Sequence, residues 1–157
     1  MPNLVIFGVI KSLHDFFTAL WIGGIWVTLI IFLPALRKTL GRDETSIQIN
    51  QAYRNRLRIV AVSSMIVLWI TGLLLGRQSP GYSGLFQFST TYTILISVKH
   101  ILTFIMILIA VWRGFLSGGR QMTAGSAREK SGFALLLLNS LLGLGVLFLS
   151  GISAALL

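Results

Sequence analysis

Two histidines are the residues of this chain best suited to chemistry. His14 and His100 are its only histidines, and each stands in a largely apolar stretch. Imidazole nitrogen is a ligand for both copper and haem iron. Because an ionisable side chain at membrane depth is costly, it usually marks a functional site. The pair therefore predicts a metal or cofactor site, with His14 and His100 as the metal ligands.

Charged residues beside the histidines offer further roles. Lys99 directly precedes His100, and its ammonium group would either extend toward the membrane surface or bind an anion such as a haem propionate. We count it with the histidines as cofactor-binding. Lys11 and Asp15 are four residues apart, the spacing of an ion pair on one helix face. The alternative role for His14 is an interfacial histidine satisfied by water or by Asp15.

Other kinds of chemistry find little support. The chain has no cysteine, which excludes disulfides, zinc fingers, Cys-ligated iron–sulfur clusters and a thiolate copper path. There is no phosphate-binding glycine loop and no HExxH motif. Asp15 is the one carboxylate of the membrane region, so we predict no catalytic residue and no hydrolytic reaction. Met65 and Met106 are either soft copper ligands or packing residues.

The composition predicts what must position these side chains. Of the 157 residues, 55% are hydrophobic and 11% are charged, whereas soluble domains carry about 25% charge. A span needs about 20 mostly apolar residues. Four segments qualify: about 12–36, 57–76, 92–117 and 132–156. We predict one membrane domain over residues 1–157, an all-α, integral membrane, antiparallel four-helix bundle.

The charge distribution predicts the topology. The net charge of +9 arises mainly in the hydrophilic segments 37–56 and 118–131, whereas 77–91 carries only Arg77. The positive-inside rule places those two loops in the cytoplasm and both termini outside. We therefore expect a multi-pass protein of the cytoplasmic (plasma) membrane, the cell inner membrane, with lipid rather than nucleic acid as its partner. The apolar stretch continues to Pro34, too long for a cleavable signal.

Small residues predict where the helices touch. Glycines allow close backbone approach in a membrane, and small or weakly polar residues at helical spacing form packing seams. The glycines concerned are Gly23 and Gly24 in the first span and Gly72 in the second. The seam of the fourth span comprises Asn139, Gly143, Val146, Ser150 and Ser153.

A shared histidine site depends on helix length. The first and third spans run in the same direction, so both histidines fall in the outer half of the bilayer. Counting 1.5 Å per residue from Arg37 and Arg113 places His14 about 15 Å further out than His100. The mismatch largely disappears if the third helix continues to Gly118. A joint site requires that longer helix.

Short motifs in three helices resemble a known family. Residues 13–24 (LHDFFTALWIGG) resemble the opening helix of the CopD family of copper-resistance membrane proteins, with its Leu-His and Trp-x-Gly-Gly. Residues 56–60 leading to 70–72 (ITG) are similar to the family's second helix, and 90–92 (TTY) with Lys99 are similar to its third. The chain departs from the pattern at Asn139, where the family often has Glu, and at Thr93, where it has Gly.

The first helix is also similar to that of the HemJ family, the haem-associated protoporphyrinogen oxidases. The shared features are the histidine of helix one, a Trp-x-x-Gly at 69–72 in helix two and the lysine of helix three. The Asn-Glu of that family's fourth helix is half matched by Asn139 and Ser140.

These patterns lead to three hypotheses. The CopD resemblance implies copper binding or transport at His14, with His100 and Lys99 nearby. The alternative is a haem b protein with His14 and His100 as axial ligands, acting in electron transfer or porphyrinogen oxidation. The third is an accessory subunit of a larger membrane complex. We favour binding or transport over catalysis, since an enzyme here would be a haem-linked oxidoreductase. A homo- or hetero-oligomer is left open.

Overall fold

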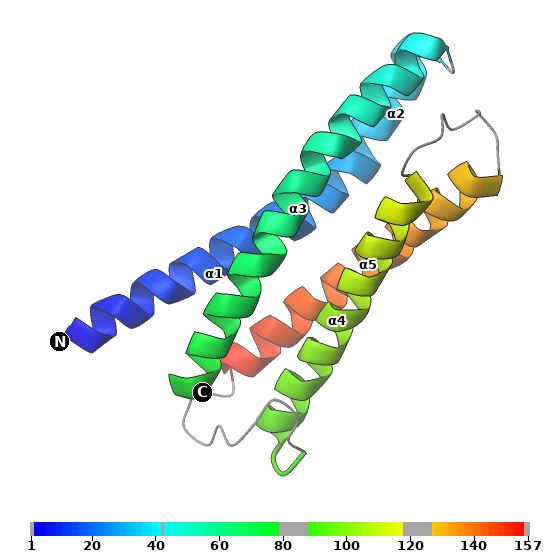
Figure 1. Cartoon of the computed structure of the whole chain (residues 1–157). Coiled ribbons are helices and arrows are strands. Elements are labelled where there is room, and N and C mark those ends of the chain that lie inside the picture. The colour runs from blue at the N-terminus through cyan, green and yellow to red at the C-terminus, as the bar shows by residue number, and fades with distance from the viewer. Residues whose placement is uncertain (1, 42, 79–87, 118–126, 156–157) are drawn as a thin grey trace.

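The computed structural model describes residues 2–41, 43–78, 88–117 and 127–155, and they are almost entirely helical. The elements are α1 (Pro2–Val27), the π-helix η1 (Thr28–Phe32), α2 (Leu33–Leu40), α3 (Glu44–Gln78), α4 (Thr91–Ser117) and α5 (Ala127–Ala155). The first three form one continuous rod that lies along α3, and α4 lies beside α5 (Figure 1).

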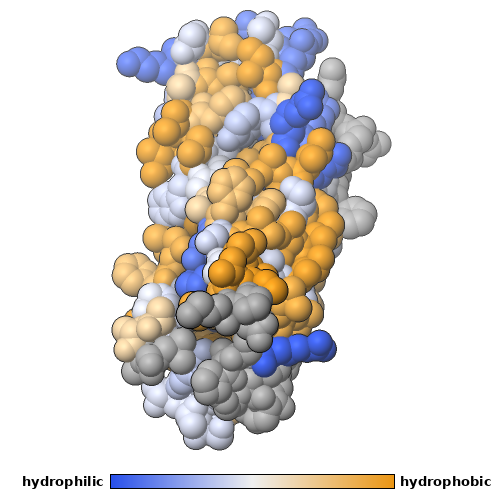
Figure 2. Space-filling view, turned by 90° about the vertical axis from the view of Figure 1, so that its left-hand side faces the viewer, coloured by the Kyte–Doolittle hydropathy of each residue, from blue (hydrophilic) through white to orange (hydrophobic). Residues whose placement is uncertain are grey.

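Four helical segments of the described chain are long and apolar enough to cross a membrane. They cover Leu4–Leu40, Glu44–Arg77, Thr91–Gly114 and Lys130–Ala155. Apolar side chains cover much of the face in Figure 2, with hydrophilic ones gathered mainly at its upper end, where α2 and α3 meet. Large apolar groups are widely exposed, such as Phe148 at 70% and Trp112 at 63%. Lipid is the solvent that suits such a surface, and the predicted all-α membrane bundle is confirmed.

The bundle consists of two antiparallel helix pairs. The rod that begins with α1 packs along α3, α4 packs along α5, and α1 meets α5 between the pairs. The buried core at this junction combines Trp21, Ile22 and Ile25 of α1 with Met106 of α4 and with Leu136 and Val146 of α5. This small core fixes how far each helix slides along its neighbours.

The packing seam predicted on the fourth span is confirmed. Asn139, Gly143, Val146 and Ser153 are buried on α5. A Cβ atom at Gly143 would lie 3.2 Å from Ile22 Cγ2 and 3.3 Å from Met106 Cε. The missing side chain therefore lets α1 and α4 approach α5 closely.

The glycines of the first span behave differently from one another. A Cβ at Gly24 would lie 3.1 Å from Leu57 Cδ1 of α3, so this glycine permits close approach as predicted. A Cβ at Gly23 would meet nothing within 4 Å in the described part of the chain, so the expectation for Gly23 was wrong. Adjacent residues on a helix point about 100° apart, and only one of the two faces α3.

A π-helical turn interrupts the first span just before a proline. Pro34 has no N–H to donate, and its ring clashes with the carbonyl group four residues earlier. Here the Leu33 N–H bonds to the Thr28 carbonyl, five residues back. The wider turn keeps the rod continuous past Pro34, as π-turns within α-helices do.

The connection expected at 37–56 is much shorter than predicted. The rod continues to Leu40 and α3 already begins at Glu44, with Gly41 at φ 62° between them. Hydrophilic residues here extend the helices beyond the apolar spans instead of forming a loop, because charged and amide side chains are good helix formers. The expected loop at 118–131 overlaps α5 from Ala127; residues 118–126 and most of 77–91 lie outside the described residues.

Candidate functional site

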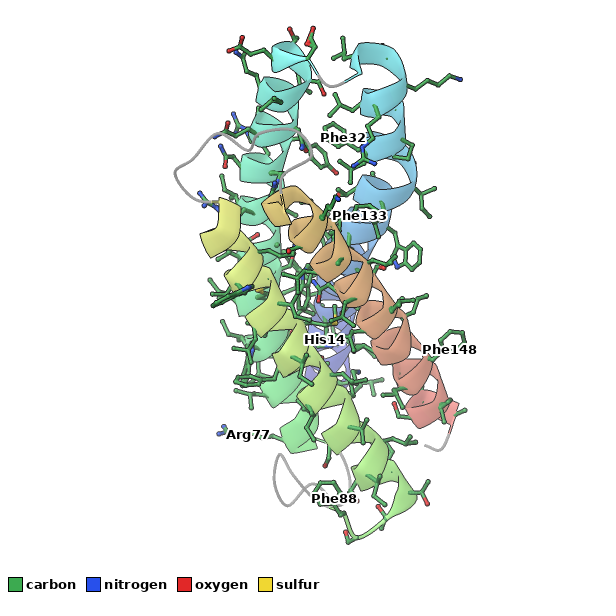
Figure 3. All side chains as sticks on the ribbon, turned by 90° about the vertical axis from the view of Figure 1, so that its right-hand side faces the viewer. His14, Phe32, Arg77, Phe88, Phe133 and Phe148 are labelled. Carbon is green, nitrogen blue, oxygen red and sulfur yellow. The ribbon has the colours of Figure 1, made fainter. Side chains whose placement is uncertain are left out.

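A cavity of about 150 Å³ lies among all four spans, and we name it the histidine cavity. Polar and soft side chains in its wall come from α1, α3 and α4. They are His14, Thr18, Met65, Lys99, His100, Thr103 and Met106. The remaining wall is apolar or aromatic, including Trp21 and Trp69. Figure 3 shows His14 at mid-height of the bundle, well away from Arg77 at one end and Phe32 at the other.

His14 is held by a hydrogen bond to a different helix. Its Nδ1 lies 2.9 Å from Thr71 Oγ1. The Thr71 hydroxyl has one proton, which it donates to the Val67 carbonyl at 2.7 Å. Thr71 therefore accepts from the imidazole, and His14 Nδ1–H is the donor. This tautomer leaves Nε2 of His14 as the basic nitrogen.

The same α3 turn admits the imidazole ring. Gly72 follows Thr71, and a Cβ at this glycine would lie 3.5 Å from His14 Cε1. Any larger side chain would therefore crowd the ring. The Thr-Gly pair noted in the sequence thus forms one side of the His14 pocket: the threonine orients the ring and the glycine leaves room for it.

His100 reaches the same tautomer by a local route. Its Nδ1 lies 2.7 Å from the carbonyl oxygen of Ile96, one turn back on α4. A carbonyl oxygen only accepts, so His100 Nδ1–H donates, and Nε2 is again the basic nitrogen. Metal-bound histidines are usually arranged in this way, with the second ring nitrogen donating to a carbonyl or similar acceptor.

The two histidines line one cavity, and the third span is long. The α4 helix runs to Ser117, close to the length that a joint site required. His14 and His100 both belong to the wall of the histidine cavity. The structure thus brings together the pair that the sequence singled out, and their role as ligands stays a prediction.

Lys99 faces the bundle and not the surrounding lipid. It lines the histidine cavity, and no described residue is its hydrogen-bond or ion-pair partner. Asp15 is engaged elsewhere, since its Oδ2 lies 3.1 Å from Lys11 Nζ in the predicted ion pair. The alternative in which Asp15 satisfies His14 is therefore wrong in this structure, where Thr71 takes that place.

Both methionines considered as copper ligands also lie in the cavity wall. Met65 comes from α3 and Met106 from α4. Met106 belongs to the core as well, with 1% of its surface exposed. Their thioether sulfurs are soft donors. The described residues of the wall thus offer two imidazoles, two thioethers and one amine, with no carboxylate or thiolate among them.

A harder metal site is not found. Among the residues that the structure describes, no group of three or more His, Cys, Asp or Glu side chains could hold an ion. Asn139 lies on the α5 seam and does not line the histidine cavity. Its Oδ1 is buried and has no hydrogen-bond partner in the described region.

Sequence reasoning missed the partner of His14 and a second polar cavity. Thr71 is 57 residues from His14 in the chain, so no local spacing joins them. Arg37 and Arg54, interpreted as topology signals, and Arg113, used as a marker of depth, line one cavity at the α2–α3 end. Only the packing of three helices brings these arginines together.

The chain was compared with protein-family models, with curated proteins and with solved structures, and none of them matches it.

Proposed function

We propose that this protein binds copper in the monovalent state inside the bilayer and either stores it or passes it across. The ligands are Nε2 of His14 and Nε2 of His100, with Met65 and Met106 as thioether donors. One observation carries the proposal: both imidazoles line one cavity, and hydrogen bonds on Nδ1 leave both Nε2 atoms free to ligate.

The donor types favour copper over other metals. Thioether ligands select Cu(I), whereas Mg²⁺, Ca²⁺ and Mn²⁺ prefer carboxylate and carbonyl oxygen. A structural zinc site takes four ligands drawn from Cys, His and carboxylates, and the described residues hold no such set. This agrees with the function that the CopD resemblance implies.

The charge pattern supports an orientation. Basic residues concentrate at the α2–α3 end, where Arg37, Lys38 and Arg54 stand. With that end in the cytoplasm, both termini lie outside and the cytoplasmic membrane is the location. His14 and His100 then lie in the outer halves of the spans Leu4–Leu40 and Thr91–Gly114, and copper would enter from that side.

Haem b is the rival ligand for the same histidines. Axial ligation also uses a free Nε2, and Lys99 would bind a propionate. The cavity measures about 150 Å³, while sites for organic ligands usually measure about 300–1,000 Å³. A single ion suits the space better than a macrocycle does.

The test is a Cu(I) affinity measurement on the full-length protein in detergent, by competition with a Cu(I) chelator under reducing conditions. Replacing either His14 or His100 with Ala should weaken binding at least about 100-fold, because each supplies a first ligand. Lys11→Ala, on the exposed face of α1 one turn from His14, is the matched control and should leave the affinity unchanged.

Unchanged copper binding by the variant with both histidines replaced would overturn the proposal. The visible spectrum of protein from haem-replete cells decides the rival, since a stoichiometric haem band that both replacements remove would establish a haem protein. A chain that binds neither ligand would support the accessory-subunit hypothesis.

A further inference from the structure

A second cavity, of about 120 Å³, lies at the α2–α3 end, and we name it the arginine cavity. Its wall comes from α2, α3, α4 and α5, with η1 contributing Thr28. Its polar wall consists of Thr28, Arg37, Ser46, Asn50, Arg54 and Arg113. The proposed copper site uses none of these side chains.

The cavity gathers three like charges from three helices. Arg37 stands on α2, Arg54 on α3 and Arg113 on α4, and all three line the cavity. Guanidinium groups remain charged at any physiological pH. Guanidinium groups that converge on one partly dehydrated space present several charged N–H donors to the same volume, and a bound anion would accept hydrogen bonds from them.

One wall of the cavity orients a cation, and another is fixed by its own hydrogen bonds. The Arg37 guanidinium carbon lies 5.8 Å from the centroid of the Phe133 ring, within cation–π range, and Phe133 also lines the cavity. Thr28 is already satisfied, since it donates to the Gly24 carbonyl at 2.6 Å and its oxygen lies 2.9 Å from the Tyr53 hydroxyl. The widened η1 turn thus contributes a fixed wall.

The cavity also contains an acceptor that nothing in the described chain satisfies. Asn50 Oδ1 is buried and has no hydrogen-bond partner among the described residues. Buried acceptors are normally paired with protein, water or ligand. An anion that also carries a hydroxyl group would match both features, with its charge toward the arginines and its hydroxyl toward Asn50.

The depth of the cavity indicates where such an anion comes from. Arg37 and Arg113 lie near the ends of the spans Leu4–Leu40 and Thr91–Gly114. This is the level at which hydrocarbon gives way to headgroups. Basic pockets between helices at this level suit anionic headgroups, and arginine binds phosphate through paired N–H donors.

We propose that the arginine cavity binds the phosphate group of a hydroxylated anion, of the kind found in a phosphatidylglycerol headgroup. A small soluble phosphate ester offers the same chemistry. The cavity volume fits a headgroup and not whole acyl chains, which would lie along the apolar outer surface.

The experiment uses the full-length protein in a neutral detergent at constant ionic strength. Unfolding is followed through its four tryptophans while phosphatidylglycerol, phosphatidylcholine, glycerol phosphate or inorganic phosphate is titrated. Phosphatidylglycerol should stabilise the fold with an affinity at least about tenfold above phosphatidylcholine. Arg54→Gln and Arg113→Gln should each lower that affinity about tenfold, the usual effect of losing a charge-assisted hydrogen bond. Arg58→Gln removes an exposed charge of α3 outside the cavity, and should change nothing.

Preference for phosphatidylglycerol identifies a lipid headgroup as the source, whereas equal stabilisation by glycerol phosphate identifies a soluble ester. No stabilisation by any phosphate compound overturns the proposal, as does an equal loss in Arg58→Gln. If Arg54→Gln and Arg113→Gln, which replace half-buried side chains, fail to elute as single species, the Arg37→Gln variant provides the test. Its side chain is exposed, so the fold should tolerate the change, and an unaltered lipid affinity would overturn the proposal.

Discussion

The histidine and arginine cavities differ more in chemistry than in size. Their volumes are about 150 Å³ and 120 Å³. The first combines neutral nitrogen and sulfur donors with an apolar wall, and the second presents three guanidinium groups. Donor atoms with lone pairs suit a cation, whereas N–H donors suit an anion. The two proposed sites would thus take ligands of opposite charge, so a substitution in the wall of one cavity should spare the other.

The largest effect is expected from filling the seam beside the histidine cavity. A Cβ at Gly143 would already lie 3.2 Å from Ile22 Cγ2 and 3.3 Å from Met106 Cε. Gly143→Leu should therefore lower the free energy of unfolding by about 2 kcal/mol, a usual cost of overpacking. It should also weaken Cu(I) binding while leaving phosphatidylglycerol binding intact.

Gly151→Leu is the matched control for the seam. It lies on the same helix, and a Cβ there would meet nothing within 4 Å in the described structure. Denaturant unfolding in detergent measures both variants. Equal losses of unfolding free energy in the two variants would show that the seam does not determine how α5 packs. The expected difference between the two cavities would then be unsupported.

The next effect concerns how His14 is oriented. Thr71→Val removes the acceptor for His14 Nδ1–H while keeping the shape of the side chain. Cu(I) affinity should fall about tenfold, as when other partners of metal-bound histidines are lost. Thr18→Val is the control, since Thr18 lines the cavity but donates to the backbone carbonyl of His14. A larger loss with Thr18→Val would contradict the role given to Thr71.

A smaller effect is expected at Lys99, where the direction of the change in Cu(I) affinity tests whether the cavity binds a cation. Its ammonium group shares the cavity with the proposed copper ligands, and two cations repel in a medium of low dielectric. Lys99→Met should raise Cu(I) affinity roughly threefold. The same variant should weaken haem retention if Lys99 binds a propionate. Lys38→Met, an exposed lysine of α2, should change neither quantity, and a fall in copper affinity at Lys99 would argue against a cation in this cavity.

The smallest effect should come from the ion pair outside both cavities. The side chains of Lys11 and Asp15 are 57% and 61% exposed, and exposed pairs contribute little to stability. Asp15→Asn should change the free energy of unfolding by less than about 0.5 kcal/mol and leave copper and lipid binding intact. Chemical unfolding in detergent provides the measurement. A loss above about 2 kcal/mol would mean that Asp15 contributes to the fold through the histidine cavity.

The histidine site was largely predictable, and its supporting contacts were not. The only two histidines, on spans of the same direction, directed attention to His14 and His100 from the sequence. Thr71, which orients His14, belongs to a helix distant in the chain. Lys99 could be expected to extend toward the membrane surface or to point into the bundle. Side-chain direction depends on the rotation of each helix about its axis, which no local pattern reports for a helix surrounded by apolar groups.

The arginine cavity, in contrast, was not predictable from the sequence. Arg37 and Arg54 were interpreted for the side of the membrane they mark, because charge near a span end predicts topology in any membrane protein, and Arg113 served only as a marker of depth. Their convergence needed the structure. Helix α3 begins at Glu44, within the expected connection, and this early start brings Arg54 beside α2 and α4.

The sequence by itself determined the solvent, the number of spans and the donor atoms on offer. These follow from transfer free energies that add up along each helix, and from side-chain types that no fold alters. The tertiary structure decided which donors share a cavity, which nitrogen of each imidazole stays basic and which cations converge. Those properties depend on the sliding and rotation of helices, which close contacts at small residues such as Gly24 and Gly143 fix between segments far apart in the chain.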